Sequence, residues 1–444
     1  MNRRDHMLKT YCTVSLLLFV NFFWSPGRPA GCAVAEELTP DIVAAIDNVF
    51  SEYDTKDQPG ASVAVVRNGM LIYSRGFGLA NMEYGVANTP DTIFHVASVS
   101  KQFTAFAILL LEEEGKLSLD DDIRKHLDWM PAFSDQIRIR HLILHTSGLR
   151  DQWSLLNMSG VRSDDVIKMY HIRNLLRRQT ELNFKPGEQW MYCNSGYTLL
   201  AYIVEEVSGK SLPQFCEERI FKPLEMSRSH FHIDHEKIVP GRAYCYDRNG
   251  SGFEKAVLSY ANVGATSLFT TAEDLTKWLT NLDTGEVGGS AVRDRMNTLG
   301  SLDDGRELLY GNGLHPVQLR GVELLGHGGS DRGFRSYAAR ARKHGVGVAV
   351  LSNRSDLSAK DLGNRTLEVL LKPHLEPAES ESNDTPARSG KARRIDEARQ
   401  LNLNITQEEL SACVGHFQLD DGNLLVTRIR NDRYRRHLKD GFAT

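Results

Sequence analysis

The sequence predicts a mixed α/β fold, of the α+β type, in which one sheet is built from both ends of the chain. Apolar runs of strand type occur early, within residues 61–73, and again late, within residues 322–352. Between them, residues 116–260 read mostly as helices joined by loops. This order of elements predicts that a helical subdomain is inserted between the two halves of the sheet.

The first elements are a helix and a hairpin. Residues 38–53 place apolar side chains at helical spacing, so we expect a helix there. Two apolar runs follow, 61–66 and 70–73, and Asn68-Gly69 lies between them. Because Asn-Gly favours the tight turns that join antiparallel strands, these runs are predicted to form a β-hairpin.

A buried helix is predicted over Thr104–Leu111, which is apolar almost all round and is followed by Gly115 as a C-cap. Ser98 would lie at its N-terminal end. Later elements are a helix at 197–207, strands at 322–325, 336–342 and 345–352, and a closing helix at 361–371.

The two ends of the chain carry different signals. Arg3, Arg4 and Lys9 precede an apolar run, and Ala33-Val34-Ala35 resembles a cleavage site, so residues 1–35 are predicted to be a signal peptide of an exported, periplasmic or secreted protein. An uncleaved anchor or a lipidated Cys32 are the alternatives, and only these would bring the chain to a membrane. Residues 373–400 are predicted to be a flexible linker, and 401–444 a short, possibly truncated β module.

Charge and cysteine content narrow the function classes. The formal net charge of the 444 residues is −4, and no basic patch stands out, which argues against a nucleic-acid partner. The 6 cysteines show no C-x-x-C or zinc spacing. A disulfide is possible outside the cytoplasm, but the sequence does not pair the cysteines.

Ser98 and Lys101 are the strongest chemical signal. Three residues apart, they share one face of a helix. A serine hydroxyl needs a base to become a nucleophile, and burial lowers a lysine pKa toward the range in which the amine is neutral. Free N–H groups at a helix start would suit a developing oxyanion. An N-capping serine beside a solvent-exposed lysine is the alternative.

Tyr192 and Asn194 form a second group. A tyrosine beside Lys101 could pass a proton to a leaving group, and an asparagine amide could hold a substrate carbonyl. A buried aromatic residue followed by an Asn turn explains the same residues without chemistry.

Six collinear segments resemble the β-lactamase-related serine hydrolases, the group of class C β-lactamases, D-alanyl-D-alanine carboxypeptidases, D-aminopeptidases and esterases (peptidase S12 type). The resemblance spans about residues 40 to 370, and its segments are 94–105, 115–121, 145–149 (His-Thr-Ser-Gly-Leu), 186–197, 264–275 and 326–334. It implies a penicillin-binding-protein-like fold with an antiparallel sheet flanked by helices, and a catalytic domain at 36–372.

The resemblance also implies roles for individual residues. Ser98 would be the nucleophile, Lys101 the general base and Tyr192 the proton shuttle. Asn194, His327, Gly329 and Ser330 would line the substrate site, with the backbone N–H groups of Ser98 and Ser330 as the oxyanion hole. His327-Gly328 stands where β-lactamases carry Lys-Thr, so efficient β-lactam hydrolysis is not expected. His327 would supply at most partial positive charge, depending on its pKa.

A metal site is the competing interpretation. His230, His232, Asp234 and His235 have the spacing of a dinuclear zinc motif, and His141 with His145 could pair on a metal. Hydrolases of the metallo-β-lactamase fold place that motif early and after an apolar strand, which this chain does not do, so the motif lacks its structural context. His145 belongs to the His-Thr-Ser-Gly-Leu segment, for which a structural role is expected.

The sequence therefore predicts an exported serine hydrolase that needs no metal or cofactor. It would cleave an amide or ester bond of a D-amino-acid peptide, an ester or a β-lactam through a Ser98 acyl-enzyme. The substrate would be a small molecule or a peptide, including cell-wall peptides. A penicillin-binding or sensor protein that acylates without turnover is the alternative of a different class.

Overall fold

A six-stranded antiparallel sheet with the strand order β12-β13-β14-β15-β1-β2 organises the chain. The computed structural model describes residues 38–377, 415–418, 424–430 and 433–439. The predicted signal peptide, most of the predicted linker, and Cys12, Cys32 and Cys413 lie outside these residues. The strands of the sheet are β1 (Ala61–Arg67), β2 (Met70–Phe77), β12 (His315–Leu319), β13 (Val322–Asp331), β14 (Phe334–Ala341) and β15 (Val346–Ser352).

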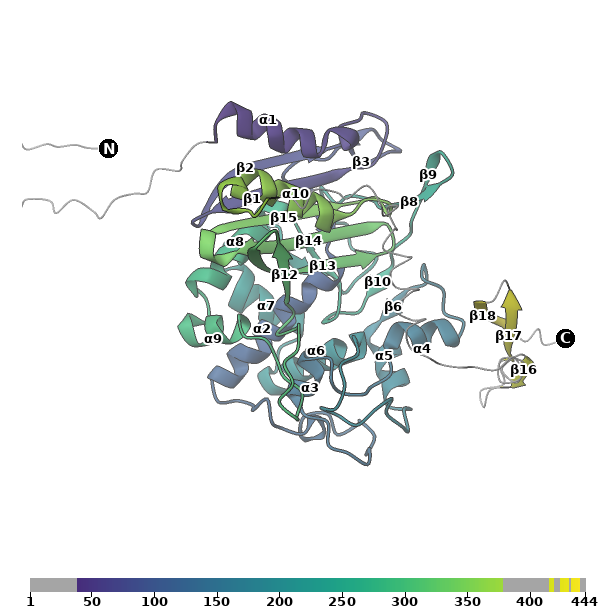
Figure 1. Ribbon diagram of the computed structural model, residues 1–444. Coiled ribbons are helices and arrows are strands. Elements are labelled where there is room, and N and C mark those ends of the chain that lie inside the picture. Colours follow the sequence, from purple (N-terminus) through teal and green to yellow (C-terminus); the bar gives the residue numbers. More distant parts are fainter. Residues whose placement is uncertain (1–37, 378–414, 419–423, 431–432, 440–444) are drawn as a thin grey trace, which may run out of the picture. The chain divides into compact units, whose positions relative to one another are not determined.

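The sheet joins the two ends of the chain, as predicted. β1 pairs with β15 so that Val63 lies opposite Val350, and Figure 1 shows the purple strand β1 beside the green strand β15. The predicted β1–β2 hairpin is also confirmed. Its turn residues Asn68 and Gly69 have φ values of 50° and 81°, as the predicted Asn-Gly turn requires.

Two helical layers cover the two faces of the sheet. Alternate residues of β1 point to opposite faces, so Val63 joins one apolar core and Ala64 the other. The first core is closed by α1 (Pro40–Val49) and α10 (Ala359–Leu371), which confirms both predicted terminal helices. The second core lies under α8 (Ala272–Thr284) and continues into the inserted helices.

The buried helix α2 (Ser100–Glu113) is the centre of the insert. Every residue from Ser100 to Leu111 is buried, because α2 packs against α6, α7 and α9. The other inserted helices are α3 (Ile139–Ile143), α4 (Gln152–Met158), α5 (Met169–Leu176), α6 (Asn194–Ser208), α7 (Leu212–Cys216), with the adjoining π-helix Glu217–Phe221, and α9 (Gly289–Met296).

The prediction of a mostly helical middle was wrong for residues 230–261. Short strands occupy this stretch, and their two to four residues are too few for strand periodicity to be read from the sequence. The short strands of the chain are β3 (Leu79–Asn81), β4 (Val86–Ala87), β5 (Phe94–His95), β6 (Ile167–Lys168), β7 (His230–Phe231), β8 (Tyr246–Asn249), β9 (Gly252–Lys255), β10 (Tyr260–Ala261) and β11 (Leu268–Thr270).

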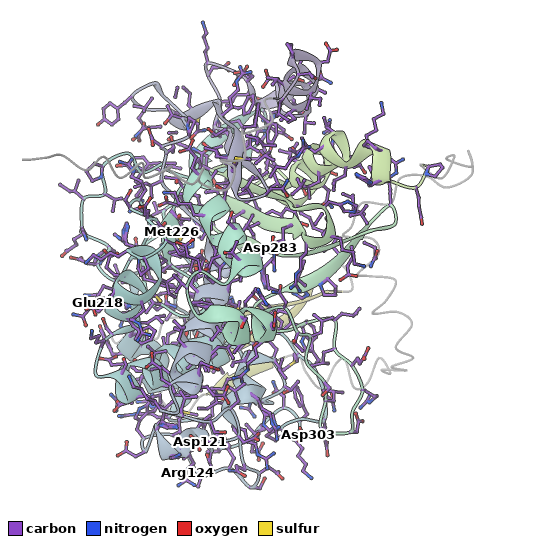
Figure 2. All side chains as sticks on the ribbon, turned by 90° about the vertical axis from the view of Figure 1, so that its left-hand side faces the viewer. Asp121, Arg124, Glu218, Met226, Asp283 and Asp303 are labelled. Carbon is purple, nitrogen blue, oxygen red and sulfur yellow. The ribbon has the colours of Figure 1, made fainter. Side chains whose placement is uncertain are left out.

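A buried arginine attaches α8 to the sheet. Arg340 on β14 is 1% exposed, and its Nε donates to Asp283 Oδ1 over 2.8 Å. Figure 2 shows Asp283 near the strands of the sheet, and Asp121 and Arg124 far from it, at the bottom of the view. Because a buried guanidinium is costly without partners, this pair fixes α8 against β14.

Three strands near the C-terminus form a separate antiparallel sheet: β16 (Gly415–Gln418), β17 (Leu424–Arg430) and β18 (Arg433–Lys439). The division of the chain into catalytic domain, linker and β module stays a prediction.

Two further observations concern the described residues alone. Their cysteines, Cys193, Cys216 and Cys245, are buried free thiols. None of their helices combines the length and apolar character that a membrane span requires.

Candidate active site

Ser98 lies in a tight turn that leads into α2. The sequence suggested that Ser98 begins the buried helix. In the structure it belongs instead to the 3₁₀ helix Ala97–Val99, which directly precedes α2. Ala97 has a φ of 48°, a left-handed conformation that is uncommon for alanine. Ser100 secures the turn, since its Oγ donates to Ala97 O (2.5 Å) and accepts from Leu268 N (3.0 Å). Ser98 is partly exposed between buried neighbours.

Lys101 is buried directly behind Ser98. Its Nζ lies 3.1 Å from Ser98 Oγ, 2.8 Å from Asn194 Oδ1 and 2.8 Å from Ala265 O. Burial lowers the pKa of Lys101 to about 7, although the carboxylates of Asp331 and Asp151 act in the opposite direction. A substantial fraction of Lys101 is therefore neutral near physiological pH.

The contacts of Lys101 orient its neutral form. A neutral amine has two N–H donors and one lone pair. Asn194 Oδ1 and the Ala265 carbonyl can only accept, so they take both donors. The lone pair is then directed at the Ser98 hydroxyl, which is the arrangement that a general base for Ser98 requires.

Asn194 is held by Asp151, a residue that the sequence did not single out. Asp151 Oδ2 accepts from Asn194 N (2.7 Å) and from Asn194 Nδ2 (2.9 Å), while Asp151 Oδ1 caps α4 by accepting from Trp153 N. Because Nδ2 is bound by Asp151, Oδ1 of Asn194 must face Lys101. The geometry makes Asn194 a partner of the base, and its predicted contact with substrate stays a prediction.

The ring of Tyr192 lies against the Lys101 amine. The Lys101 Nζ is 4.9 Å from the centre of the Tyr192 ring. Burial raises the pKa of Tyr192 well above its usual value, although the Ser98 hydroxyl acts in the opposite direction. Tyr192 is therefore protonated at neutral pH and suited to donating a proton.

The ring of His145 packs against the ring of Tyr192, in keeping with the structural role expected for His145. The His145 and Tyr192 rings are 4.3 Å apart, and His145 Nδ1 accepts from Cys193 N over 3.1 Å. His145 Nε2 lies 3.1 Å from the Tyr310 hydroxyl. His141 is engaged elsewhere, because its Nδ1 accepts from Arg138 N. The two histidines are thus used separately.

The end of β13 borders the site, next to the turn that carries Ser98. A Cβ atom on Gly329 would lie 2.3 Å from Val96 O and 3.1 Å from Ala97 Cβ, so only glycine allows this strand to reach the turn that carries Ser98. Ser330, next on the strand, is exposed. β13 therefore passes beside the turn that carries Ser98, and the oxyanion hole formed by the N–H groups of Ser98 and Ser330 stays a prediction.

His327 is buried and neutral. Burial, together with the neighbouring His315 and Lys101, lowers its pKa to about 3. The sequence left the charge of His327 to its pKa, and a pKa of about 3 leaves the imidazole uncharged near neutral pH, because burial disfavours the imidazolium. Its ring centre lies 6.2 Å from that of Tyr192.

The alternative zinc motif does not converge. Within the ranges that the structure describes, no three His, Cys, Asp or Glu side chains form a group that could hold a metal ion. His230 and His232 pack against the ring of Phe269 with centroid distances of 5.6 and 4.6 Å. Burial lowers the pKa of each to about 4.

Residues that sequence reasoning missed share one property: they act through tertiary contacts. No sequence motif marks Asp151, Ala265 or Ser100 as functional. Each nevertheless lies within or next to a segment that the family resemblance covers. The signal that could have found them is their adjacency to those segments.

Comparison with known proteins agrees with this geometry. The family profile described as Beta-lactamase matches residues 46–371. A D-aminopeptidase of Brucella ovis is 30% identical over 336 residues, which cover 73% of this chain and 62% of the relative. A D-aminopeptidase of Brucella anthropi is 32% identical over 284 residues, which cover 62% of this chain and 52% of that relative. The chain thus spans less than two thirds of the length of these relatives.

Solved structures share the fold. A penicillin-binding protein homologue from Pyrococcus abyssi superposes with a TM-score of 0.64 at 25% identity, covering 90% of this chain and 89% of its own. A D-amino acid amidase from Ochrobactrum anthropi superposes with a TM-score of 0.63 at 23% identity, covering 75% and 99%. With its serine-lysine-tyrosine centre on this sheet and helices, the chain belongs to the beta-lactamase family of serine hydrolases.

Proposed function

We propose that this protein hydrolyses the amide bond of D-amino-acid amides or short peptides through an acyl-enzyme on Ser98. The observation that carries the proposal is the orientation of Lys101, whose lone pair faces Ser98 Oγ because Asn194 and Ala265 take its two donors. The relatives described as D-aminopeptidases support the choice of substrate.

The reaction runs in two halves. Ser98 Oγ attacks the carbonyl carbon while its proton moves to Lys101 Nζ, and the oxyanion accepts hydrogen bonds from the N–H groups of Ser98 and Ser330. Tyr192 gives its proton to the leaving amine and recovers one from Lys101. A water molecule then attacks the ester, the same groups carry its proton, and Ser98 and the acid are released.

β-Lactams are expected to be poor substrates. Neutral His327 offers no cation to a β-lactam carboxylate, and each lost charge-assisted hydrogen bond costs about 1.5–3 kcal/mol.

A substrate panel on purified protein tests the proposal. It contains D-alanine p-nitroanilide, its L-enantiomer, p-nitrophenyl acetate and nitrocefin, with the Ser98→Ala variant as control. We expect the D-anilide to have the highest kcat/KM and nitrocefin to be slow or inert. Nitrocefin turnover faster than every amide and ester would contradict the assignment.

A further inference from the structure

The Asp331 carboxylate is fixed on one side and open on the other. Its Oδ2 lies 2.9 Å from His95 Nε2 and also accepts from the Thr266 hydroxyl. Among the residues that the structure describes, Oδ1 makes no hydrogen bond, and the side chain is 17% exposed. The carboxylate thus has a fixed position and one free acceptor.

Asp331 lies beside the reacting groups. Gly329 and Asp331 are two residues apart on β13 and so share a face of the strand. That face contacts the segment leading to Ser98, since Gly329 packs on Val96 and Asp331 binds His95. Thr266, the other partner, follows Ala265, whose carbonyl binds Lys101.

On β13, Asp331 directly follows Ser330, the residue expected to hold the acyl oxygen. An acyl group on Ser98 with its oxygen at the N–H of Ser330 carries its α-substituent one bond from the carbonyl carbon. Because Asp331 is the next residue on the strand and its Oδ1 is free among the described residues, we expect that α-substituent to face its carboxylate.

An aromatic wall adjoins the carboxylate. Tyr260 lies near Asp331, because its ring centre is 6.5 Å from that of His95, and His95 binds the carboxylate. Trp153 stacks on Tyr260 with ring centres 4.8 Å apart, and Trp153 follows Asp151, which holds Asn194. Aromatic faces beside a carboxylate attract cations.

The two nearby arginines, Arg332 and Arg335, donate to other groups, so neither pairs directly with Asp331. Arg335 donates from Nη1 to the carbonyls of Arg332 and Phe334. Arg332 donates to Val257 O and to Ser163 Oγ. A cation supplied by the substrate can therefore take the free oxygen of Asp331.

We propose that Asp331 Oδ1 binds the free α-ammonium group of the substrate's acyl part and so selects amides of unblocked amino acids. This inference rests on the proposed function and adds to it the residue that would distinguish free from N-acylated substrates.

The test is a cycle of two changes, one in the enzyme and one in the substrate. The kcat/KM values of D-alanine p-nitroanilide and of its N-acetyl form are measured for the wild type, Asp331→Asn and Thr266→Val. We expect Asp331→Asn to lower the ratio of free to acetylated substrate by about 10- to 100-fold, the value of one charge-assisted hydrogen bond.

Thr266→Val is the matched control. It removes a hydrogen bond from the same cluster but keeps the carboxylate charge, so it should change the ratio of free to acetylated substrate far less than Asp331→Asn does. If Asp331→Asn lowers kcat/KM for both substrates by one factor, Asp331 is only structural and the inference is wrong.

A second measurement uses the wild type alone, in case Asp331→Asn does not fold. The hydroxyl analogue, D-lactic acid p-nitroanilide, should be cleaved at least about tenfold less efficiently than the D-alanine compound, and equal efficiency would overturn the inference. Failure of the proposed function looks different, because the wild type would then cleave neither D-alanine p-nitroanilide nor its N-acetyl form.

Discussion

At the scale of single residues, the site depends on a lysine whose charge is removed by burial. Lys101 lies within reach of Ser98 Oγ, and its pKa of about 7 leaves the base available near neutral pH. The sequence predicted the identity of these residues, because Ser-x-x-Lys places them on one side of a turn. It could not predict Asp151 or the Ala265 carbonyl as partners, since these come from distant parts of the chain.

The pH dependence of turnover follows from this pKa. Below about pH 7 Lys101 is protonated and cannot accept the Ser98 proton, so kcat/KM for p-nitrophenyl acetate should rise with pH and level off above about 7. His327, with a pKa of about 3, stays neutral throughout this range and adds no transition. The uncharged ester avoids titration of the substrate itself.

A profile that is flat between about pH 5 and 9, or one that falls as pH rises through 7, would contradict Lys101 as the base. Ellman-type thiol titration on the same samples is a useful check that the protein stays folded, because Cys193, Cys216 and Cys245 are buried in the native state.

At the scale of elements, the approach of β13 to the Ser98 turn is the critical contact. Gly329→Ala would place a Cβ 2.3 Å from Val96 O and from Ser336 Oγ, which requires the strand to move. We expect a loss of about 1–3 kcal/mol in the free energy of unfolding and of about 100-fold in kcat/KM.

Gly328→Ala is the control for that strand. Its Cβ would meet only Ser336 O at 3.6 Å, an ordinary contact, so the free energy of unfolding should change little. Urea denaturation and kinetics on both variants make the comparison. Equal effects of the two substitutions would show that the close contact at Gly329 is unimportant.

The elements differed in how well they could be predicted. The β1–β2 hairpin, α2 and α10 were predicted because Asn-Gly turns and apolar periodicity are local signals. β12, at His315–Leu319, was missed because it is short and contains Pro316. Proline has no N–H to donate and therefore argues against a strand interior. It is an edge strand of the sheet, where proline is tolerated.

At the scale of the whole molecule, the sheet and its helices end before the C-terminal strands begin. Glu376 closes the described catalytic part, since its N–H donates to Arg320 O over 2.9 Å and its carbonyl accepts from the Arg320 guanidinium. We predict that a chain ending at Pro377 keeps the melting temperature and turnover of the longer protein.

A chain ending at Lys372 is the matched comparison, because it lacks the contact between Glu376 and Arg320. It should melt at a lower temperature than the chain ending at Pro377. If removal of residues 378–444 alone abolishes turnover, the C-terminal segment is part of the site. Export of the chain, with cleavage after Ala35, remains a prediction from the sequence.

The central claim is that Ser98 is the nucleophile, and covalent labelling tests it most directly. The protein is treated with a fluorophosphonate, and the modified residue is located by intact-mass measurement and peptide mapping, in parallel with Ser98→Ala. We predict one adduct on the peptide that contains Ser98, no adduct in Ser98→Ala, and a loss of more than about a thousandfold in kcat for that variant. An adduct on another residue, or full turnover by Ser98→Ala, would contradict the account.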